Sequence, residues 1–228
     1  MTDTPVALIT GASRGIGRAI CEKLAVPDTH VFINYASASE AAEETAVKVR
    51  AAGAAATLLK ADVSQDEAVA AMFKAVLEAT GRIDVLVNNA GITRDGLLVR
   101  MKPADWGRVI ETNLSGAFRC IQQATKPMMK QRYGRIINMG YGPANRLEPL
   151  EGTGLYHLAK TALLVYTKAM AREEASRGIT VNMVSPGTIF TSVNRPSVKT
   201  IPAGRYAKYS DLVNAALFLL KDESSYVT

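Results

Sequence analysis

The chain has 228 residues, of which 48% are hydrophobic and 21% charged, a composition typical of a single globular domain with a large core. Its two cysteines, Cys21 and Cys120, are isolated and match no Cys/His ligand spacing, which excludes a disulfide framework and a conventional zinc site. No apolar run is long enough to span a membrane and the first residues do not resemble a signal peptide, so we expect a cytoplasmic protein.

The net charge of +6 is concentrated in one part of the chain. Residues 94–135 carry nine basic and three acidic side chains, which accounts for the whole excess. Such a region can attract an acidic partner, or it can be a solvated face or the rim of an interface. Aromatic residues do not alternate with the basic ones, so nucleic acid is not expected as a partner.

Apolar segments alternate with helical patterns along the chain. The pattern predicts a strand at 5–11, a loop and helix at 12–26, a strand at 30–36, a helix at 40–53, a strand at 56–64, a helix at 65–81, a strand at 83–91, helical stretches at 103–131, a strand at 134–140, a helix at 154–177, a strand at 179–187 and a helix at 209–220. This alternation predicts parallel βαβ units. We therefore expect one α/β domain over residues 1–228, with a doubly wound, Rossmann-like parallel sheet.

A glycine-rich loop follows the first predicted strand. Gly11, Gly15 and Gly17 have a GxxxGxG spacing between that strand and the first helix. Glycines permit the tight turn and let the backbone approach a pyrophosphate, which the free N–H groups of the helix N-terminus can bind. Glycine clusters also make ordinary turns, but this placement favours a dinucleotide site.

The end of the second strand predicts which dinucleotide binds. NAD-selective sites usually place an acidic residue there, whereas this chain has no acid between Asn34 and Glu40. Arg14, in the glycine loop, can pair with a 2′-phosphate, and Ser37 can add a hydroxyl. Arg14 can also be an ordinary solvated charge. The sequence favours NADP(H).

Tyr156 and Lys160 lie four residues apart, which places both side chains on one face of a helix. A free tyrosine has a pKa of about 10 and is a poor proton donor near neutral pH, but a neighbouring cation stabilises its phenolate. Tyrosine and lysine also occur at this spacing on ordinary amphipathic helices. Because a dinucleotide loop precedes this pair, we predict Tyr156 as the general acid and Lys160 as its electrostatic activator.

Several motifs together resemble the short-chain dehydrogenase/reductase family in order and spacing. They are TGASRGIG at 10–17, NNAG at 88–91, Asn113, the Tyr156–Lys160 pair and SPG at 185–187. Within the family, residues 88–102, 128–140 and 171–187 are most similar to bacterial 3-oxoacyl-(acyl-carrier-protein) reductases. The resemblance implies NADPH-dependent reduction of a carrier-bound 3-oxoacyl thioester, as in fatty acid biosynthesis, by a homotetramer or dimer.

The resemblance also assigns roles to individual residues. Asn113 is implied to interrupt its helix and to hold a water in a proton relay to Lys160. Arg132 and Arg172 match basic positions with which relatives bind the acidic acyl carrier protein. These two arginines can equally be solvated surface charges or part of a subunit interface. The full set of expected cofactor contacts is Gly11, Ser13, Arg14, Gly15, Ile16 and Gly17 in the loop, Ser37 at the 2′-phosphate, Asp62 and Val63 at the adenine, Asn89, Ala90 and Gly91 at the ribose and sheet, then Tyr156, Lys160, Pro186, Gly187, Ile189 and Thr191.

The chain departs from the family at the catalytic serine that normally follows the strand at 134–140. No serine occurs between Ser115 and Ser176. Aligned from the strand, the position falls at Tyr141; counted back from Tyr156, it falls at Pro143. The candidate replacements are Tyr141, Asn145, Thr153, Arg146 and the backbone N–H of Gly142. We expect a rebuilt carbonyl-orienting loop, because an unfilled donor position costs about 10²–10³ in rate.

Two further departures concern the lid and the last strand. The segment SVNRPSVKT at 192–200 is shorter than the usual lid, which predicts an open cleft. The family's final strand is not found. The alternatives to a 3-oxoacyl reductase are a reductase or dehydrogenase of another ketone or alcohol, and a non-catalytic NADP-binding protein; retention of Asn113, Tyr156 and Lys160 together opposes the last. No metal is expected.

Overall fold

The structure is a computed structural model that describes residues 4–94, 96–148, 151–192 and 195–228. Its strands are β1 Val6–Ile9, β2 His30–Tyr35, β3 Ala55–Lys60, β4 Val85–Asn88, β5 Gly134–Met139 and β6 Ile179–Val184. Its helices are α1 Gly15–Leu24, α2 Ser39–Ala51, α3 Asp66–Thr80, α4 Pro103–Ile110, α5 Gly116–Gln131, α6 Gly154–Glu174 and α7 Tyr209–Leu220. The predicted α/β alternation is confirmed.

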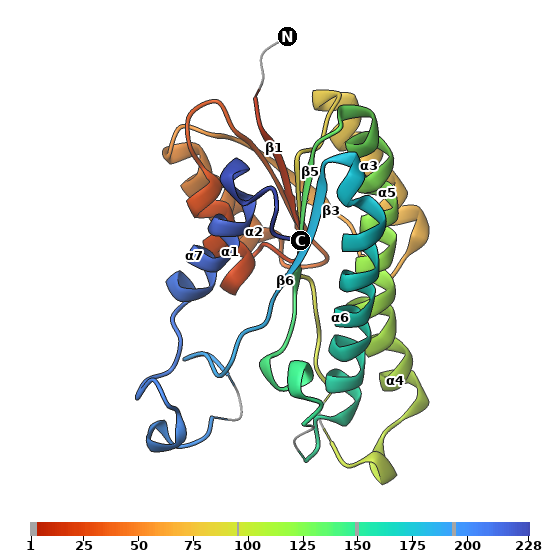
Figure 1. Cartoon of the computed structure of the whole chain (residues 1–228), viewed down its shortest axis with the longest axis vertical. Helices are drawn as coiled ribbons and strands as arrows, with labels where there is room; N and C mark the ends of the chain where they lie inside the picture. Colours follow the sequence, from red (N-terminus) through yellow and green to blue (C-terminus); the bar gives the residue numbers. More distant parts are fainter. Residues whose placement is uncertain (1–3, 95, 149–150, 193–194) are drawn as a thin grey trace.

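The six strands form one parallel sheet in the order β3-β2-β1-β4-β5-β6. The order reverses direction between β1 and β4, as in a doubly wound fold. Figure 1 shows the sheet nearly edge-on, with α1, α2 and α7 over one face and α3, α4, α5 and α6 over the other. The sheet is therefore the middle layer of three.

Each face of the sheet has its own core. Along β1, Val6 and Leu8 pack with side chains of α3 and α5, while Ala7 and Ile9 pack with α1, α2 and α7. All four residues of β1 are buried. A strand covered on both faces is apolar throughout, which is why the sequence pattern predicted the strands well.

Several predicted segments differ from the structure. The helical stretch at 103–131 is divided into α4 and α5 by a π-helical turn, η2 Glu111–Ser115. Strands predicted at 56–64, 83–91 and 179–187 end earlier, at Lys60, Asn88 and Val184, because the residues that follow form the loops of the site. Short 3-10 turns occur at η1 Leu98–Arg100, η3 Gly142–Arg146, η4 Ala175–Arg177, η5 Val198–Thr200 and η6 Asp222–Ser224.

In the described part of the chain, β6 is followed by no seventh strand, and Val227 and Thr228 lie against β6 instead. The Oγ1 of Thr228 accepts a hydrogen bond from the Val181 amide, and the Val227 oxygen accepts one from the Asn182 side chain. The predicted short lid includes residues 193–194, which lie outside the described residues. No helix in the described ranges has the length and apolar character of a membrane span.

Candidate active site

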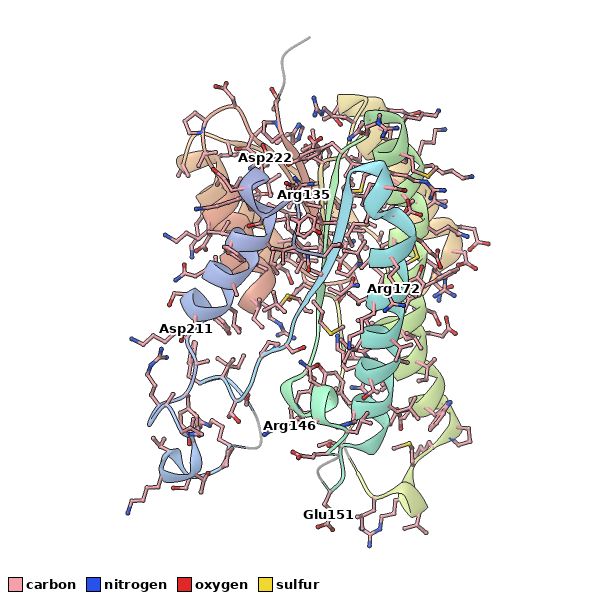
Figure 2. The ribbon with its side chains drawn as sticks, viewed as in Figure 1. Arg135, Arg146, Glu151, Arg172, Asp211 and Asp222 are labelled. Carbon is pink, nitrogen blue, oxygen red and sulfur yellow. The ribbon has the colours of Figure 1, made fainter. Side chains whose placement is uncertain are left out.

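The predicted site residues gather where the strands of the sheet end. The loops after β1, β4, β5 and β6 carry most of them, and ligands of open parallel sheets bind beyond these carboxyl ends. Figure 2 shows Arg146 and Glu151, from the loop between β5 and α6, at this end of the molecule and Arg135 with Asp222 at the opposite end. The fold thus brings residues separated by nearly 180 positions to one edge.

The glycine loop between β1 and α1 requires its glycines. Gly11 and Gly15 have φ of +60° and +64°, and a Cβ on Gly11 would lie 2.8 Å from the Ala90 Cα. A Cβ on Gly17 would lie 2.5 Å from Asn89 Nδ2. The loop therefore packs directly on the segment after β4, and no side chain caps the N-terminus of α1. The chemistry of this cradle fits a phosphate group.

Two polar residues that the sequence did not single out hold this loop. Arg18 donates to the Ser13 and Ala41 oxygens and forms an ion pair with Glu44 across 2.9 Å, so it fastens the loop to α2. Asn34 is 1% exposed; its Oδ1 accepts from the Gly11 amide and its Nδ2 donates to the Leu59 and Ala61 oxygens. Asn34 thus has a structural role at the end of β2.

The residues predicted to contact the adenosine part of the cofactor lie in the segments that follow β1, β2 and β3. Arg14 and Ser37 are exposed, and Asp62 is exposed with its Oδ1 accepting from the Ser64 amide and hydroxyl. Val63 is buried against Gly116. Arg14 is the extended residue that begins α1. The structure places these groups at the same edge of the sheet as the glycine loop. The segment after β2, between Asn34 and Glu40, contains no acidic residue.

The segment after β4 is tied to the end of β1 by Thr10 and Asn89. Thr10 Oγ1 accepts from the Asn89 and Ala90 amides at 3.0 Å, and Asn89 Nδ2 donates to the Thr10 and Gly11 oxygens. Asn89 and Ala90 therefore support the glycine loop from below. Gly91 faces the Asn113 side chain, whose Oδ1 would be 2.7 Å from a Cβ at that position.

Asn113 lies within the π-helical turn, so the helix is interrupted where the resemblance implied. It is 1% exposed, and its Nδ2 donates to the Ile92 and Val109 oxygens at 2.8 and 2.9 Å. Its Oδ1 is buried with no partner among the described residues. Asn113 therefore joins α4 to the segment after β4, and its relay role stays a prediction.

The loop after β6 faces the glycine loop through Tyr209, another residue that the sequence analysis missed. The Tyr209 hydroxyl donates to Thr191 Oγ1 across 3.2 Å and would be 3.7 Å from a Cβ on Gly15. Ile189 forms a β-bridge with Ala207. Pro186 accepts a hydrogen bond at its oxygen from the Gly142 amide, and Gly187 is exposed beside it. No local pattern marked Tyr209, because it begins α7, far from the motifs.

Tyr156 and Lys160 occupy the first turns of α6, beside the end of β5. Lys160 Nζ lies 5.7 Å from the centre of the Tyr156 ring and donates to the Met139 oxygen across 2.7 Å. Lys160 is 3% exposed, and burial lowers the pKa of its ammonium to about 8. Tyr156 is partly exposed. The predicted pair is therefore assembled, with a buried cation behind an accessible phenol.

Tyr141, where the position of the missing serine falls when aligned from the strand, lies immediately beyond β5. The Tyr141 ring lies 5.4 Å from the Tyr156 ring at 66° and 6.0 Å from the His157 ring at 89°, measured between ring centres. Such tilted and edge-to-face arrangements are favourable for aromatic rings. Tyr141 is thus a predicted replacement that contacts Tyr156.

The other predicted replacements are placed differently. Asn145 Oδ1 accepts a hydrogen bond from Ser185 Oγ across 3.1 Å, so its amide is oriented from the end of β6. Thr153 directly precedes α6, and its oxygen accepts from the His157 amide. Arg146 is paired with Glu148. The backbone N–H of Gly142 was wrong as a donor candidate, because it donates to the Pro186 oxygen at 2.7 Å.

Arg132 and Arg172 do not lie at this edge. Arg132 ends α5 with a φ of +54°, just before β5 begins, and Arg172 is in the last turn of α6. Sixteen residues separate Arg172 from Tyr156 along α6, which corresponds to about 24 Å at 1.5 Å per residue. A carrier contact through these arginines stays a prediction. In the described residues there is no cluster of three or more His, Cys, Asp or Glu suited to a metal.

Comparisons with known proteins agree with this architecture. The family model of the short chain dehydrogenases matches residues 5–202. The chain is 43% identical to 3-oxoacyl-(acyl-carrier-protein) reductase FabG of Staphylococcus aureus, covering all of this chain and 95% of that protein. It is 42% identical to the 3-oxoacyl-(acyl-carrier-protein) reductase of a Synechocystis species, covering 98% and 92% of the two chains.

A solved structure has the same fold. A chain from Sinorhizobium meliloti 1021, assigned in its description to the short-chain alcohol dehydrogenases, superposes with a TM-score of 0.89 at 33% identity, covering 98% of this chain and 92% of that one. The family match spans most of the chain. The glycine loop, the doubly wound sheet and the Tyr156–Lys160 pair are all present in the structure. The protein therefore belongs to the short-chain dehydrogenase family of oxidoreductases.

Proposed function

We propose that the protein is an NADPH-dependent reductase that converts a 3-oxoacyl thioester, bound to an acyl carrier protein, into the 3-hydroxyacyl form. The observation that supports it most directly is the pairing of Tyr156 with the buried Lys160 at the carboxyl edge of the sheet. The two reductases described above, 43% and 42% identical over nearly their full length, support the substrate class.

The residues at the sheet edge fit a nicotinamide dinucleotide. The cradle formed by Gly11, Gly15 and Gly17 would hold the pyrophosphate at the N-terminus of α1. Arg14 and Ser37 would receive the 2′-phosphate, which favours NADPH over NADH. The remaining proposed contacts are Ser13, Ile16, Asp62, Val63, Asn89, Ala90, Gly91, Pro186, Gly187, Ile189 and Thr191. When bound, reduced NADP supplies a hydride to the carbonyl carbon.

Tyr156 would donate the proton that the carbonyl oxygen needs. Lowering a tyrosine pKa by three units requires about 4 kcal/mol of preferential stabilisation of the phenolate. The Lys160 ammonium is a suitable source, because it lies near the ring and is screened from water by burial. With a pKa of about 8 it stays charged at neutral pH. Asn113 would hold a water that returns a proton toward Lys160.

The group that orients the substrate carbonyl differs from the serine usual in the family. Tyr141 is the proposed donor to the carbonyl oxygen, since its ring contacts Tyr156 and the serine position falls on it when aligned from the strand. Asn145, held by Ser185, and Thr153 are the other candidates. Removal of a donor of this kind costs about 10²–10³ in rate.

The proposal extends to partners and assembly. An acidic carrier protein would bind near Arg132 and Arg172, within or beside the basic part of the chain, and the enzyme would be a cytoplasmic homo-oligomer, a tetramer or dimer. Both arginines are exposed, which such a contact requires.

A second candidate is a reductase or dehydrogenase of another ketone or alcohol. It is favoured by Tyr141, whose ring is much larger than a serine side chain and reshapes the wall beside Tyr156. The solved relative assigned to the alcohol dehydrogenases is consistent with it.

The test is oxidation of NADPH, followed by absorbance at about 340 nm, with acetoacetyl-CoA as substrate. We expect turnover with NADPH, slower turnover with NADH and a loss of turnover in Tyr156→Phe. Absence of turnover together with tight NADPH binding would overturn the acyl-thioester proposal. A panel of ketones then separates the second candidate from a non-catalytic NADP-binding protein.

A further inference from the structure

His157 is a buried polar residue that the proposed mechanism does not use. It follows Tyr156 on α6 and is 6% exposed. Neither its Nδ1 nor its Nε2 has a hydrogen-bond partner among the described residues. Buried polar atoms are nearly always paired, so an imidazole with both nitrogens unpaired at this place requires an explanation.

The His157 ring makes an aromatic contact with Tyr141. The two rings are 6.0 Å apart and nearly perpendicular, at 89°. Tyr141 also contacts Tyr156, and the centres of these two rings are 5.4 Å apart. Consecutive residues of one helix therefore contact the same tyrosine, and two contacts at different angles restrict both the position and the tilt of its ring.

A tyrosine at a serine position needs such restriction. Its hydroxyl lies at the end of a longer side chain with two rotatable bonds, so small changes in the ring move the hydroxyl far more than a serine hydroxyl moves. Catalytic donors act only when they are held near the productive geometry. The backbone beside Tyr141 is already held, because the Gly142 amide donates to the Pro186 oxygen.

We propose that His157 is a positioning residue that acts through Tyr141: its ring packs against the Tyr141 ring and holds the phenol where it can donate to the substrate carbonyl. This inference rests on the proposed function. It assigns the role to the shape of the imidazole rather than to its nitrogens, which are unpaired. His157→Phe should therefore keep the role, and His157→Ala should lose it.

The experiment is a double-mutant cycle with NADPH and acetoacetyl-CoA, in which kcat and KM are measured for wild type, Tyr141→Phe, His157→Ala and the double variant. We expect Tyr141→Phe to lower kcat by about 10²–10³, and His157→Ala by about 10- to 100-fold through misplacement of the phenol. The double variant should match Tyr141→Phe, because His157 acts only through that hydroxyl. The KM for NADPH should not change, and His157→Phe should stay near wild type.

Several outcomes would overturn the inference. One is an equal loss of kcat from His157→Ala in the wild type and in Tyr141→Phe. Another is no loss of kcat from His157→Ala. A third is no loss of kcat from Tyr141→Phe while Tyr156→Phe is inactive. The last outcome leaves the proposed reductase standing without this inference. Thermal melting of each variant identifies unfolding, and His157→Phe then decides between the two, since its flat ring can make the same edge-to-face contact with Tyr141.

If the wild type showed no turnover, the proposed function would be wrong. Tyrosine NMR would then test whether His157 restricts the Tyr141 ring. With ring-labelled tyrosine, the Tyr141 signal is the one missing from Tyr141→Phe among the eight tyrosines. We expect faster flipping of the Tyr141 ring in His157→Ala and wild-type flipping in His157→Phe. Equal flipping rates in wild type and His157→Ala would contradict the proposal.

Discussion

Lys160 donates a hydrogen bond from its Nζ to the main-chain oxygen of Met139, the last residue of β5, across 2.7 Å. The bond joins the start of α6 to the end of the sheet and leaves the ammonium 5.7 Å from the Tyr156 ring. Because the group is buried, its pKa falls to about 8. The charge that would activate Tyr156 is therefore lost in mildly alkaline solution.

The first prediction concerns the pH dependence of reduction. We expect kcat/KM to fall as pH rises through about 8, because deprotonation of Lys160 removes the cation beside Tyr156. The measurement is kcat/KM between about pH 6 and pH 10. Lys160→Met should be slow at every pH and lack this limb, whereas a wild-type profile that stays flat to the alkaline end would contradict the assignment.

The same shift has a consequence for stability. A lysine whose pKa is lowered by folding binds fewer protons in the folded state than in the unfolded state between about pH 8 and its ordinary value. The free energy of unfolding contributed by Lys160 therefore rises with pH across that window. Urea unfolding of wild type and Lys160→Met at both ends of the window should show a rise that the variant lacks.

The second prediction tests the glycine cradle. Gly17→Ala places a methyl group 2.5 Å from Asn89 Nδ2 and 2.8 Å from the Gly11 oxygen. We expect a loss of about 1–3 kcal/mol in the free energy of unfolding and weaker NADPH binding, measured by thermal melting and fluorescence titration. Gly107→Ala in α4 is the control, since nothing lies within 4 Å of that Cβ; it should not destabilise the protein.

The third prediction addresses cofactor choice. Arg14 is exposed at the start of α1, where a charge-assisted hydrogen bond to a 2′-phosphate is available. Arg14→Ala should raise the Kd for NADPH by about 10- to 100-fold and change the Kd for NADH little. Lys23→Ala, in the last turn of the same helix, controls for general charge. An equal loss of affinity for NADPH and NADH would show that Arg14 does not bind the 2′-phosphate.

The fourth prediction separates carrier binding from chemistry. Arg172 lies about 24 Å along α6 from Tyr156, and Arg132 lies where β5 begins. Arg172→Glu combined with Arg132→Glu should raise KM for a carrier-bound substrate and leave kcat/KM for acetoacetyl-CoA unchanged. Lys126→Glu, exposed on α5, is the matched charge reversal. Loss with both substrates would indicate a structural or interface role instead.

Much of the fold was predictable because its signals are local. The alternation of apolar strands with helices depends on neighbours in the chain, as do the glycine loop and the spacing of Tyr156 and Lys160 on one helical turn. The resemblance to the family added the interruption at Asn113, where the structure has its π-helical turn. Strand ends were less accurate, because the residue at which a strand ends depends on its pairing with neighbouring strands, which the local pattern does not record.

The sequence by itself determined the α/β class, the glycine loop, the spacing of Tyr156 and Lys160, and the absence of a serine between Ser115 and Ser176. Only the tertiary structure decided what surrounds them: Tyr141 between Tyr156 and His157, Ser185 holding Asn145, and Tyr209 joining Thr191 to the glycine loop. It also separated Arg132 and Arg172 from the site. The physical reason is that these contacts depend on the order of the strands and the packing of the helices, which no spacing along the chain records.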